Sequence, residues 1–191
     1  FKGADLILRV NPDRPKGHHE HVKTAGPKAK FGIALDMLPA ARAAAEAAGA
    51  RIVGLHAHAG SGVAEAEHWR EIGTILAQAA ERFDHVRLLN VGGGLGVPEM
   101  PDAPVLDLAK VERNLQTLKK AAPGFDLWME PGRYLVAESG VLLTRVTQIK
   151  HTMSTRFIGV STGMNSLIRP ALYGARHEIV NLTRFGDAPA G

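Results

Sequence analysis

Apolar residues follow two different spacings along the first two thirds of the chain. Short apolar runs typical of buried β-strands occur at residues 4–12, 51–58, 85–91 and 126–130. Helices are predicted between them: at residues 37–48, which are rich in alanine and end before Gly49; at residues 65–83, where apolar residues recur at helical spacing; and at residues 107–121. Strands that alternate with helices form parallel sheets with crossover helices, so the pattern predicts an α/β fold.

The pattern changes near Ser139 and Gly140. Beyond this point, residues 140–150, 157–160 and 178–183 are typical of strands, and no helical pattern separates them. We therefore expect two parts: an α/β layer over residues 1–139 and the start of a β-rich domain over residues 140–191.

The predicted α/β layer resembles half of an eight-stranded barrel. Four parallel strands and three helices are half of a (β/α)8 TIM-like barrel, which takes about 250 residues. Half a barrel leaves two open sheet edges, which favour unwanted strand pairing. Either the sheet is an open, doubly wound one, or the chain is an internal fragment of a longer protein. We favour the fragment.

Composition and charge exclude several functional classes. The 191 residues are 45% hydrophobic and 22% charged, as in soluble globular proteins. The absence of cysteine excludes disulfides, thiolate-bound metals and a cysteine nucleophile in this chain, and is consistent with the cytoplasm. The net charge of +4 is spread out, so we expect no nucleic-acid partner. No apolar run approaches the ~18 residues of a membrane span, so we expect no membrane partner.

Unusual residues gather where the predicted strands end, which is where parallel α/β folds bind ligands. Alternation places His56 and His58 on one face of a strand, before Gly60-Ser61-Gly62. The two histidines could bind a metal, although no carboxylate lies close by in sequence. Alternatively, one is buried and hydrogen-bonded, or one imidazole stacks on a flat ring. Ser61 and its neighbouring backbone N–H groups suit a phosphate.

A glycine run follows the next strand. Gly92, Gly93 and Gly94 do not begin a dinucleotide-binding G-x-G-x-x-G motif, because Val97 stands where the third glycine is needed. The run is either a tight turn or a loop whose N–H groups bind an anion.

Two further clusters carry charge. Glu130-Pro131-Gly132-Arg133 ends the fourth strand, and its Glu–Arg pair is either satisfied internally or directed at a basic ring nitrogen and a phosphate or carboxylate. Arg169 and Tyr173 either clamp a substrate carboxylate or lie in a surface loop.

Two other groups favour simpler interpretations. The tract His18-His19-Glu20-His21 could hold a metal, but in a polar loop over residues 13–27 it is more often solvated, and we expect no metal site. Helical spacing predicts a core role for Trp69, Ile72, Ile75 and Leu76.

Taken together, the clusters resemble the fold-type III pyridoxal-phosphate decarboxylases, and within them the diaminopimelate decarboxylases. The resemblance runs from Leu6 to about Arg184. The matching stretches, in order, are residues 8–12, 30–33, 54–61, 90–94, 130–133 and 168–173. It implies an alanine racemase-like barrel that binds pyridoxal 5'-phosphate, followed by the start of a β-sheet domain.

The resemblance also implies roles. His58 would stack on the cofactor ring, and Ser61 with Gly92, Gly93 and Gly94 would hold its phosphate. Glu130 would pair with the pyridine nitrogen, within a cofactor-binding stretch that continues through Pro131, Gly132 and Arg133. Arg133, Arg169 and Tyr173 would bind an amino-acid substrate. The implied reaction is the decarboxylation of meso-2,6-diaminopimelate to L-lysine and CO2, by a cytoplasmic homodimer with shared active sites.

The sequence departs from the family in informative places. Ser161-Thr162 and Ser166 replace family residues, in a form that resembles a branch fused to an aspartate kinase. The family's cofactor-binding lysine and its partner-supplied cysteine motif have no counterpart here. We therefore expect this chain alone to be inactive. The remaining alternatives are an ornithine- or arginine-type decarboxylase and a non-catalytic, partner-binding homologue.

Overall fold

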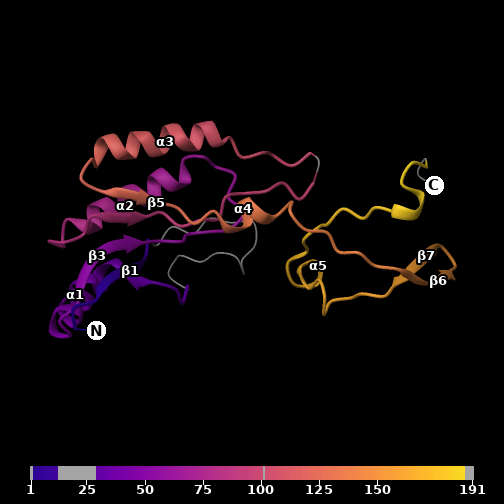
Figure 1. Ribbon diagram of the computed structural model, residues 1–191, viewed down its shortest axis with the longest axis horizontal. Coiled ribbons are helices and arrows are strands. Elements are labelled where there is room, and N and C mark those ends of the chain that lie inside the picture. Colours follow the sequence, from indigo (N-terminus) through magenta and orange to yellow (C-terminus); the bar gives the residue numbers. More distant parts are fainter. Residues whose placement is uncertain (1, 13–28, 101, 188–191) are drawn as a thin grey trace. The chain divides into compact units, whose positions relative to one another are not determined.

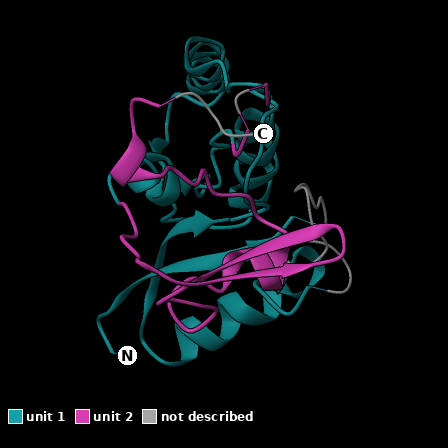
Figure 2. Ribbon diagram, turned by 90° about the vertical axis from the view of Figure 1, so that its right-hand side faces the viewer, with its two compact units in different colours: residues 1–98, 104–140 teal, residues 99–103, 141–191 magenta. Residues whose placement is uncertain are grey.

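A computed structural model describes residues 2–12, 29–100 and 102–187. The loop predicted at residues 13–27, with its histidine tract, lies outside these ranges. The chain divides into two compact units, coloured separately in Figure 2. Unit 1 comprises residues 1–98 and 104–140, and unit 2 comprises residues 99–103 and 141–191.

Unit 1 is built on a parallel sheet (Figure 1). Its five strands, in the spatial order β2-β1-β3-β4-β5, are β2 (Ile33–Ala34), β1 (Asp5–Asn11), β3 (Arg51–His56), β4 (Leu88–Asn90) and β5 (Asp126–Trp128). The four predicted strands are confirmed, with later starts or earlier ends. The two-residue strand β2 was not predicted, because it is too short to show any periodicity.

Three long helices connect these strands. They are α1 (Leu38–Ala47), α2 (His68–Ala80) and α3 (Leu108–Ala121), and a 3-10 turn, Leu35–Met37, precedes α1. Asp107 caps α3 by accepting the Lys110 backbone N–H at 2.9 Å. The turn after α1 places Gly49 at a φ of +70°, the left-handed conformation that glycine adopts without strain. All three helices occur where the sequence predicted them.

The sheet has one buried face and one open face. Leu8, Leu55, Leu89 and Leu127 pair in register across four strands. They belong to a single hydrophobic cluster that also contains residues of α1, α2 and α3. Helices that share one core on one face, with β1, β3, β4 and β5 in sequential order, are a property of barrels and not of doubly wound sheets.

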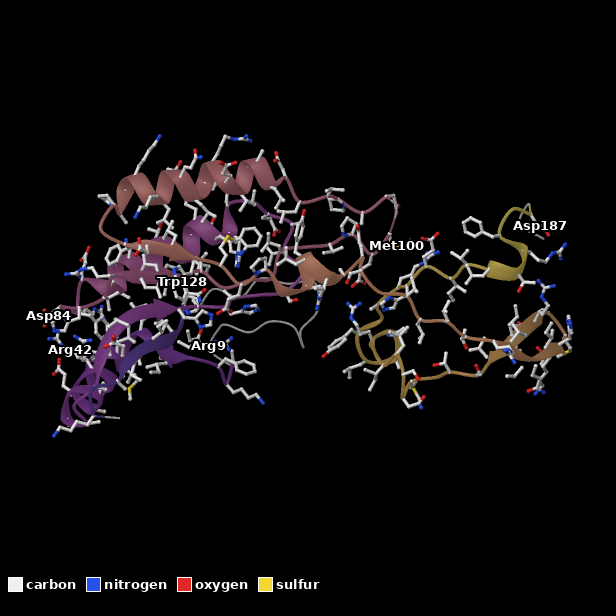
Figure 3. The ribbon with its side chains drawn as sticks, in the orientation of Figure 1. Arg9, Arg42, Asp84, Met100, Trp128 and Asp187 are labelled. Atoms are coloured by element: carbon white, nitrogen blue, oxygen red, sulfur yellow. The ribbon has the colours of Figure 1, made fainter. Side chains whose placement is uncertain are left out.

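Two contacts link the helices of this layer to their neighbours. At Gly73 of α2, an added Cβ would lie 2.2 Å from Leu118 Cδ2, so a larger residue would require the Leu118 side chain of α3 to move. Arg42 on α1 pairs with Asp84, beyond the end of α2, at 2.5 Å, and Figure 3 shows the two side chains together.

Unit 2 is a small assembly of short elements. A hairpin of β6 (Val146–Thr152) and β7 (Thr155–Val160) is followed by the one-turn helix α5 (Arg169–Tyr173) and a 3-10 turn, Leu182–Arg184. The expectation of a strand over residues 178–183 is wrong. Its alternation suits a strand, but the described residues offer it no partner, and part of it forms the 3-10 turn instead.

Unit 2 buries little apolar surface. Among its described residues, Ala175 alone is buried, and Ile149, Phe157 and Ile158 of the hairpin are each more than half exposed. A two-stranded hairpin without a covered face is marginally stable in water.

Candidate active site

One row of side chains crosses the open face of the sheet in unit 1. Arg9, His56, Asn90 and Trp128 pair in register on four neighbouring strands. Because neighbours in register share a face, these side chains lie opposite the leucine row of the core. Arg9 on β1 and Trp128 on β5 are labelled in Figure 3. Trp128 is 56% exposed, so no described segment covers this end of the row.

The row continues past the strand ends. His58 and Glu130 follow His56 and Trp128 by two positions, the spacing of side chains on one face. The sequence predicted His56 and His58 on one face and Glu130 at a strand's end. The register adds that these groups meet Asn90 and Arg9.

Two side chains, from β4 and β3, face the Glu130 carboxylate. Asn90 Nδ2 donates to Glu130 Oε1 at 2.9 Å. His56 Nε2 is buried, has no hydrogen-bond partner among the described residues, and lies 3.5 Å from Glu130 Oε2. The Glu130 side chain is still 51% exposed, which leaves the carboxylate accessible to a ligand.

The glycine run is shaped by close backbone contacts. An added Cβ would lie 2.4 Å from the Ala57 carbonyl oxygen at Gly92, 1.9 Å from that of Glu130 at Gly93, and 2.1 Å from that of Gly60 at Gly94. Close approach of neighbouring strand ends therefore requires all three glycines, a larger structural demand than the single-glycine turn considered from sequence.

Two of the three glycine N–H groups already have acceptors. The Gly92 N–H donates to Asn90 Oδ1 at 2.9 Å, and the Gly93 N–H donates to His58 Nδ1 at 3.2 Å. The Gly94 N–H and the Ser61 hydroxyl have no hydrogen-bond partner in the described part of the chain. These two donors remain available to an anion.

A buried side chain of the core is hydrogen-bonded to the glycine loop. Trp69 on α2 is fully buried, as predicted, and its indole N–H donates to the Gly93 carbonyl at 2.9 Å. The helical spacing predicted the burial of Trp69, but nothing in the sequence indicated this hydrogen bond.

Burial and a nearby positive charge lower the pKa of both histidines, which favours the neutral imidazole. The pKa of His56 is lowered by burial first, then by Arg9 and His58, and the Glu130 carboxylate offsets part of that effect. The pKa of His58 is lowered by burial and Arg9, again against Glu130. Neutral imidazoles suit contact with a flat ring, and His58 is oriented because its Nδ1 accepts from Gly93.

Arg9 is a site residue that sequence reasoning missed. Its guanidinium donates to the His58 carbonyl at 3.4 Å and lies 4.8 Å from the centre of the Phe31 ring. The signal was present, because an arginine inside an apolar strand is unusual unless it serves a site.

The remaining predicted site residues do not belong to this row of paired strand positions. Pro131 precedes the short helix α4 (Gly132–Val136), which was not predicted, and Arg133 is exposed on its first turn. Arg169 and Tyr173 belong to α5 in unit 2. There Arg169 pairs with Glu99 at 2.7 Å, and its other terminal nitrogen lies 3.4 Å from His177 Nε2.

The described residues include no group of three or more histidine, cysteine, aspartate or glutamate side chains that could hold a metal ion. None of their helices combines the length and hydrophobicity needed to cross a bilayer.

Comparison with known proteins decides the family. Residues 1–137 match the family model "Pyridoxal-dependent decarboxylase, pyridoxal binding domain". The chain belongs to the pyridoxal-dependent decarboxylases. Residues 106–190 of this decarboxylase-family chain also match the model of the family's C-terminal sheet domain.

Curated relatives are diaminopimelate decarboxylases. The chain is 36% identical over 200 residues to one from Methanothermobacter thermautotrophicus, covering 99% of this chain and 46% of that protein. It is 37% identical to one from Escherichia coli strain K12, covering 96% and 45%. The chain thus spans less than half the length of these relatives.

Solved structures agree. Diaminopimelate decarboxylase from Helicobacter pylori, complexed with L-lysine, matches with a TM-score of 0.86 and 30% identity, over 96% of this chain and 47% of that one. This match confirms the prediction of part of an alanine racemase-like α/β barrel.

Proposed function

We propose that this chain is the cofactor-binding part of a longer enzyme that decarboxylates meso-2,6-diaminopimelate to L-lysine and CO2. The observation that carries the proposal is the fixed, half-exposed carboxylate of Glu130, beside a neutral His58 and two free donors. A carboxylate, an imidazole and anion-binding donors match the three recognisable parts of pyridoxal phosphate: its ring nitrogen, its ring face and its phosphate.

Each group would have one task. Glu130 would hold a proton at the pyridine nitrogen, which makes the bound ring a stronger electron sink for the electrons left by CO2 loss. His58 would contact the ring face. The Ser61 hydroxyl and the Gly94 N–H would bind the phosphate, while Gly92 and Gly93 shape the loop. Pro131 and Gly132 would place Arg133 near the phosphate and the substrate.

The substrate proposal rests on the relatives and on unit 2. Diaminopimelate carries a second amino-acid head, whose carboxylate suits an arginine. Arg169 and Tyr173 would bind this head. Arg169 already pairs with Glu99 and lies near His177. When the substrate binds, these two contacts would either break or hold the guanidinium in position for the substrate carboxylate.

The longer enzyme is called the parent protein below. We propose it because the chain spans less than half of its relatives and lacks the family's cofactor-binding lysine and its cysteine motif. The parent protein would supply both groups, function as a cytoplasmic homodimer with shared sites, and show an intact mass well above 20.4 kDa in its source cells. An aspartate kinase fused to it would add to that mass.

The test compares substrates and one variant. The parent protein is assayed for CO2 release from diaminopimelate, ornithine and arginine, with and without Arg169→Ala. We expect Arg169→Ala to raise the KM for diaminopimelate by roughly 10- to 100-fold, because a charged hydrogen bond is lost. An unchanged KM would contradict the substrate proposal, and faster release from ornithine or arginine would favour that class. Absence of all activity, in a protein that carries the missing lysine, would favour the non-catalytic homologue.

A further inference from the structure

We propose that Asn90 and His56 are positioning residues that fix the Glu130 carboxylate, one on each oxygen, for the cofactor's pyridine nitrogen. The inference rests on the proposed function, because it assigns Glu130 the partner named there. It adds two residues that neither touch the reacting atoms nor bind the phosphate.

The Asn90 side chain acts as an oriented bridge. Its Oδ1 accepts the Gly92 N–H at 2.9 Å, so its Nδ2 must face the opposite way, where it donates to Glu130 Oε1 at 2.9 Å. Asn90 is only 6% exposed, so water offers little competition for either bond. One amide thereby ties the turn of the glycine loop to one carboxylate oxygen.

His56 serves the second oxygen. Its Nε2 is buried, has no hydrogen-bond partner among the described residues, and lies 3.5 Å from Glu130 Oε2. A neutral imidazole carries one proton, and a proton on Nε2 would satisfy both this orphaned nitrogen and the carboxylate. A small movement of either side chain would shorten the separation to that of an ordinary hydrogen bond.

Holding both oxygens fixes the plane of the carboxylate. A half-exposed glutamate with only one partner would rotate about its terminal torsion, which is broad. Neighbours on β3 and β4 remove that freedom, because His56 and Asn90 are paired in register on adjacent strands. The rigid sheet therefore sets the direction in which Glu130 presents its charge.

A polarity swap separates positioning from general stability. In the parent protein freed of cofactor, affinity for pyridoxal phosphate is measured by equilibrium titration for Asn90→Asp, Glu130→Gln and the double variant. Asn90→Asp keeps an acceptor for the Gly92 N–H but places a carboxylate against Glu130. We expect it to weaken binding roughly 10- to 100-fold, because a hydrogen bond to a charged group is lost and like charges meet.

The double variant restores an amide–carboxylate pair with its polarity reversed. If Asn90 acts through Glu130, Asn90→Asp has less than about a twofold effect once Glu130 is already Gln. The matched control is Asn114→Asp on α3, where a half-buried asparagine donates to the carbonyls of Lys110 at 2.9 Å and Ala66 at 3.4 Å and makes no hydrogen bond to Glu130. The control is expected to keep wild-type affinity.

A second arm does not depend on Asn90. His56→Gln keeps an N–H donor and should weaken binding less than His56→Leu, and the two should be equal in the Glu130→Gln background. If the His56 and Asn90 variants lose as much cofactor affinity in the Glu130→Gln background as in the wild type, the positioning proposal is wrong. The cofactor assignment would not be affected by that result. A wild-type parent protein that binds no pyridoxal phosphate would instead overturn the proposed function itself.

Discussion

Gly93 is the position where one added methyl group should have the largest consequence. Replacement by alanine places a Cβ 1.9 Å from the Glu130 carbonyl oxygen and 2.9 Å from its carbon. Both are backbone atoms, so no side-chain rotation relieves the overlap. Gly93 does not have a positive φ, so the perturbation is a steric one and carries no conformational penalty of its own.

The structure sets the size of the effect. Ordinary Cβ contacts begin at 3.4 Å, so the ends of β4 and β5 would have to separate by about 1.5 Å. That movement strains the hydrogen bond from the Glu130 N–H to the Gly92 carbonyl, which is 2.8 Å long. Overpacking costs typically ~1–3 kcal/mol, and we expect about 3 kcal/mol here because backbone must move.

Urea unfolding of the cofactor-free parent protein measures this cost as a change in midpoint at constant slope. The matched control is Gly124→Ala, where an added Cβ meets nothing within 4 Å. Its effect should stay within about 0.5 kcal/mol. A Gly93→Ala protein as stable as the control would refute the argument that these strand ends approach too closely for a side chain.

Three further predictions follow from the same structure. Trp69→Phe keeps the aromatic bulk but leaves the Gly93 carbonyl without its donor, so we expect a loss of ~1–3 kcal/mol in the free energy of unfolding, measured in urea; a neutral result would show that the bond is unimportant. The pKa values of His56 and His58 lie below the ordinary 6.5, so the unfolded chain binds more protons as pH falls through that value, and the thermal midpoint should drop between pH 7.5 and pH 5.5. His56→Gln should flatten this slope, and a slope equal to that of the wild type would contradict the assignment. In the isolated 191-residue chain, trypsin should cut at Lys150 and Arg156 of the exposed β6–β7 hairpin before it cuts within α2. Mass spectrometry of the fragments gives the order of cleavage. Earlier cleavage within α2 would contradict the prediction that unit 2 is the less well packed unit.

The sequence was most informative where periodicity and caps act locally. α3 was predicted at residues 107–121, and the structure differs only by making Asp107 the cap. The core role of Trp69 and the strand ahead of Glu130 also follow from local spacing. These features depend on residues close together in the chain.

The failures involve long-range partners. Residues 178–183 have the alternation of a strand, but a strand needs a neighbour, and the sequence does not show whether one exists. The bridge from Gly92 through Asn90 to Glu130 depends on the register between β4 and β5, which alternation alone does not fix. Arg9 was passed over because its neighbours, His58 and Phe31, are distant in the chain.

The products formed from meso-2,6-diaminopimelate test the central claim most directly. The parent protein, supplied with pyridoxal phosphate, should release CO2 and L-lysine in equal amounts, and Glu130→Gln should slow both together because the ring nitrogen loses its carboxylate partner. Tight cofactor binding with no lysine formed, or lysine formed at the same rate by Glu130→Gln, would contradict the account.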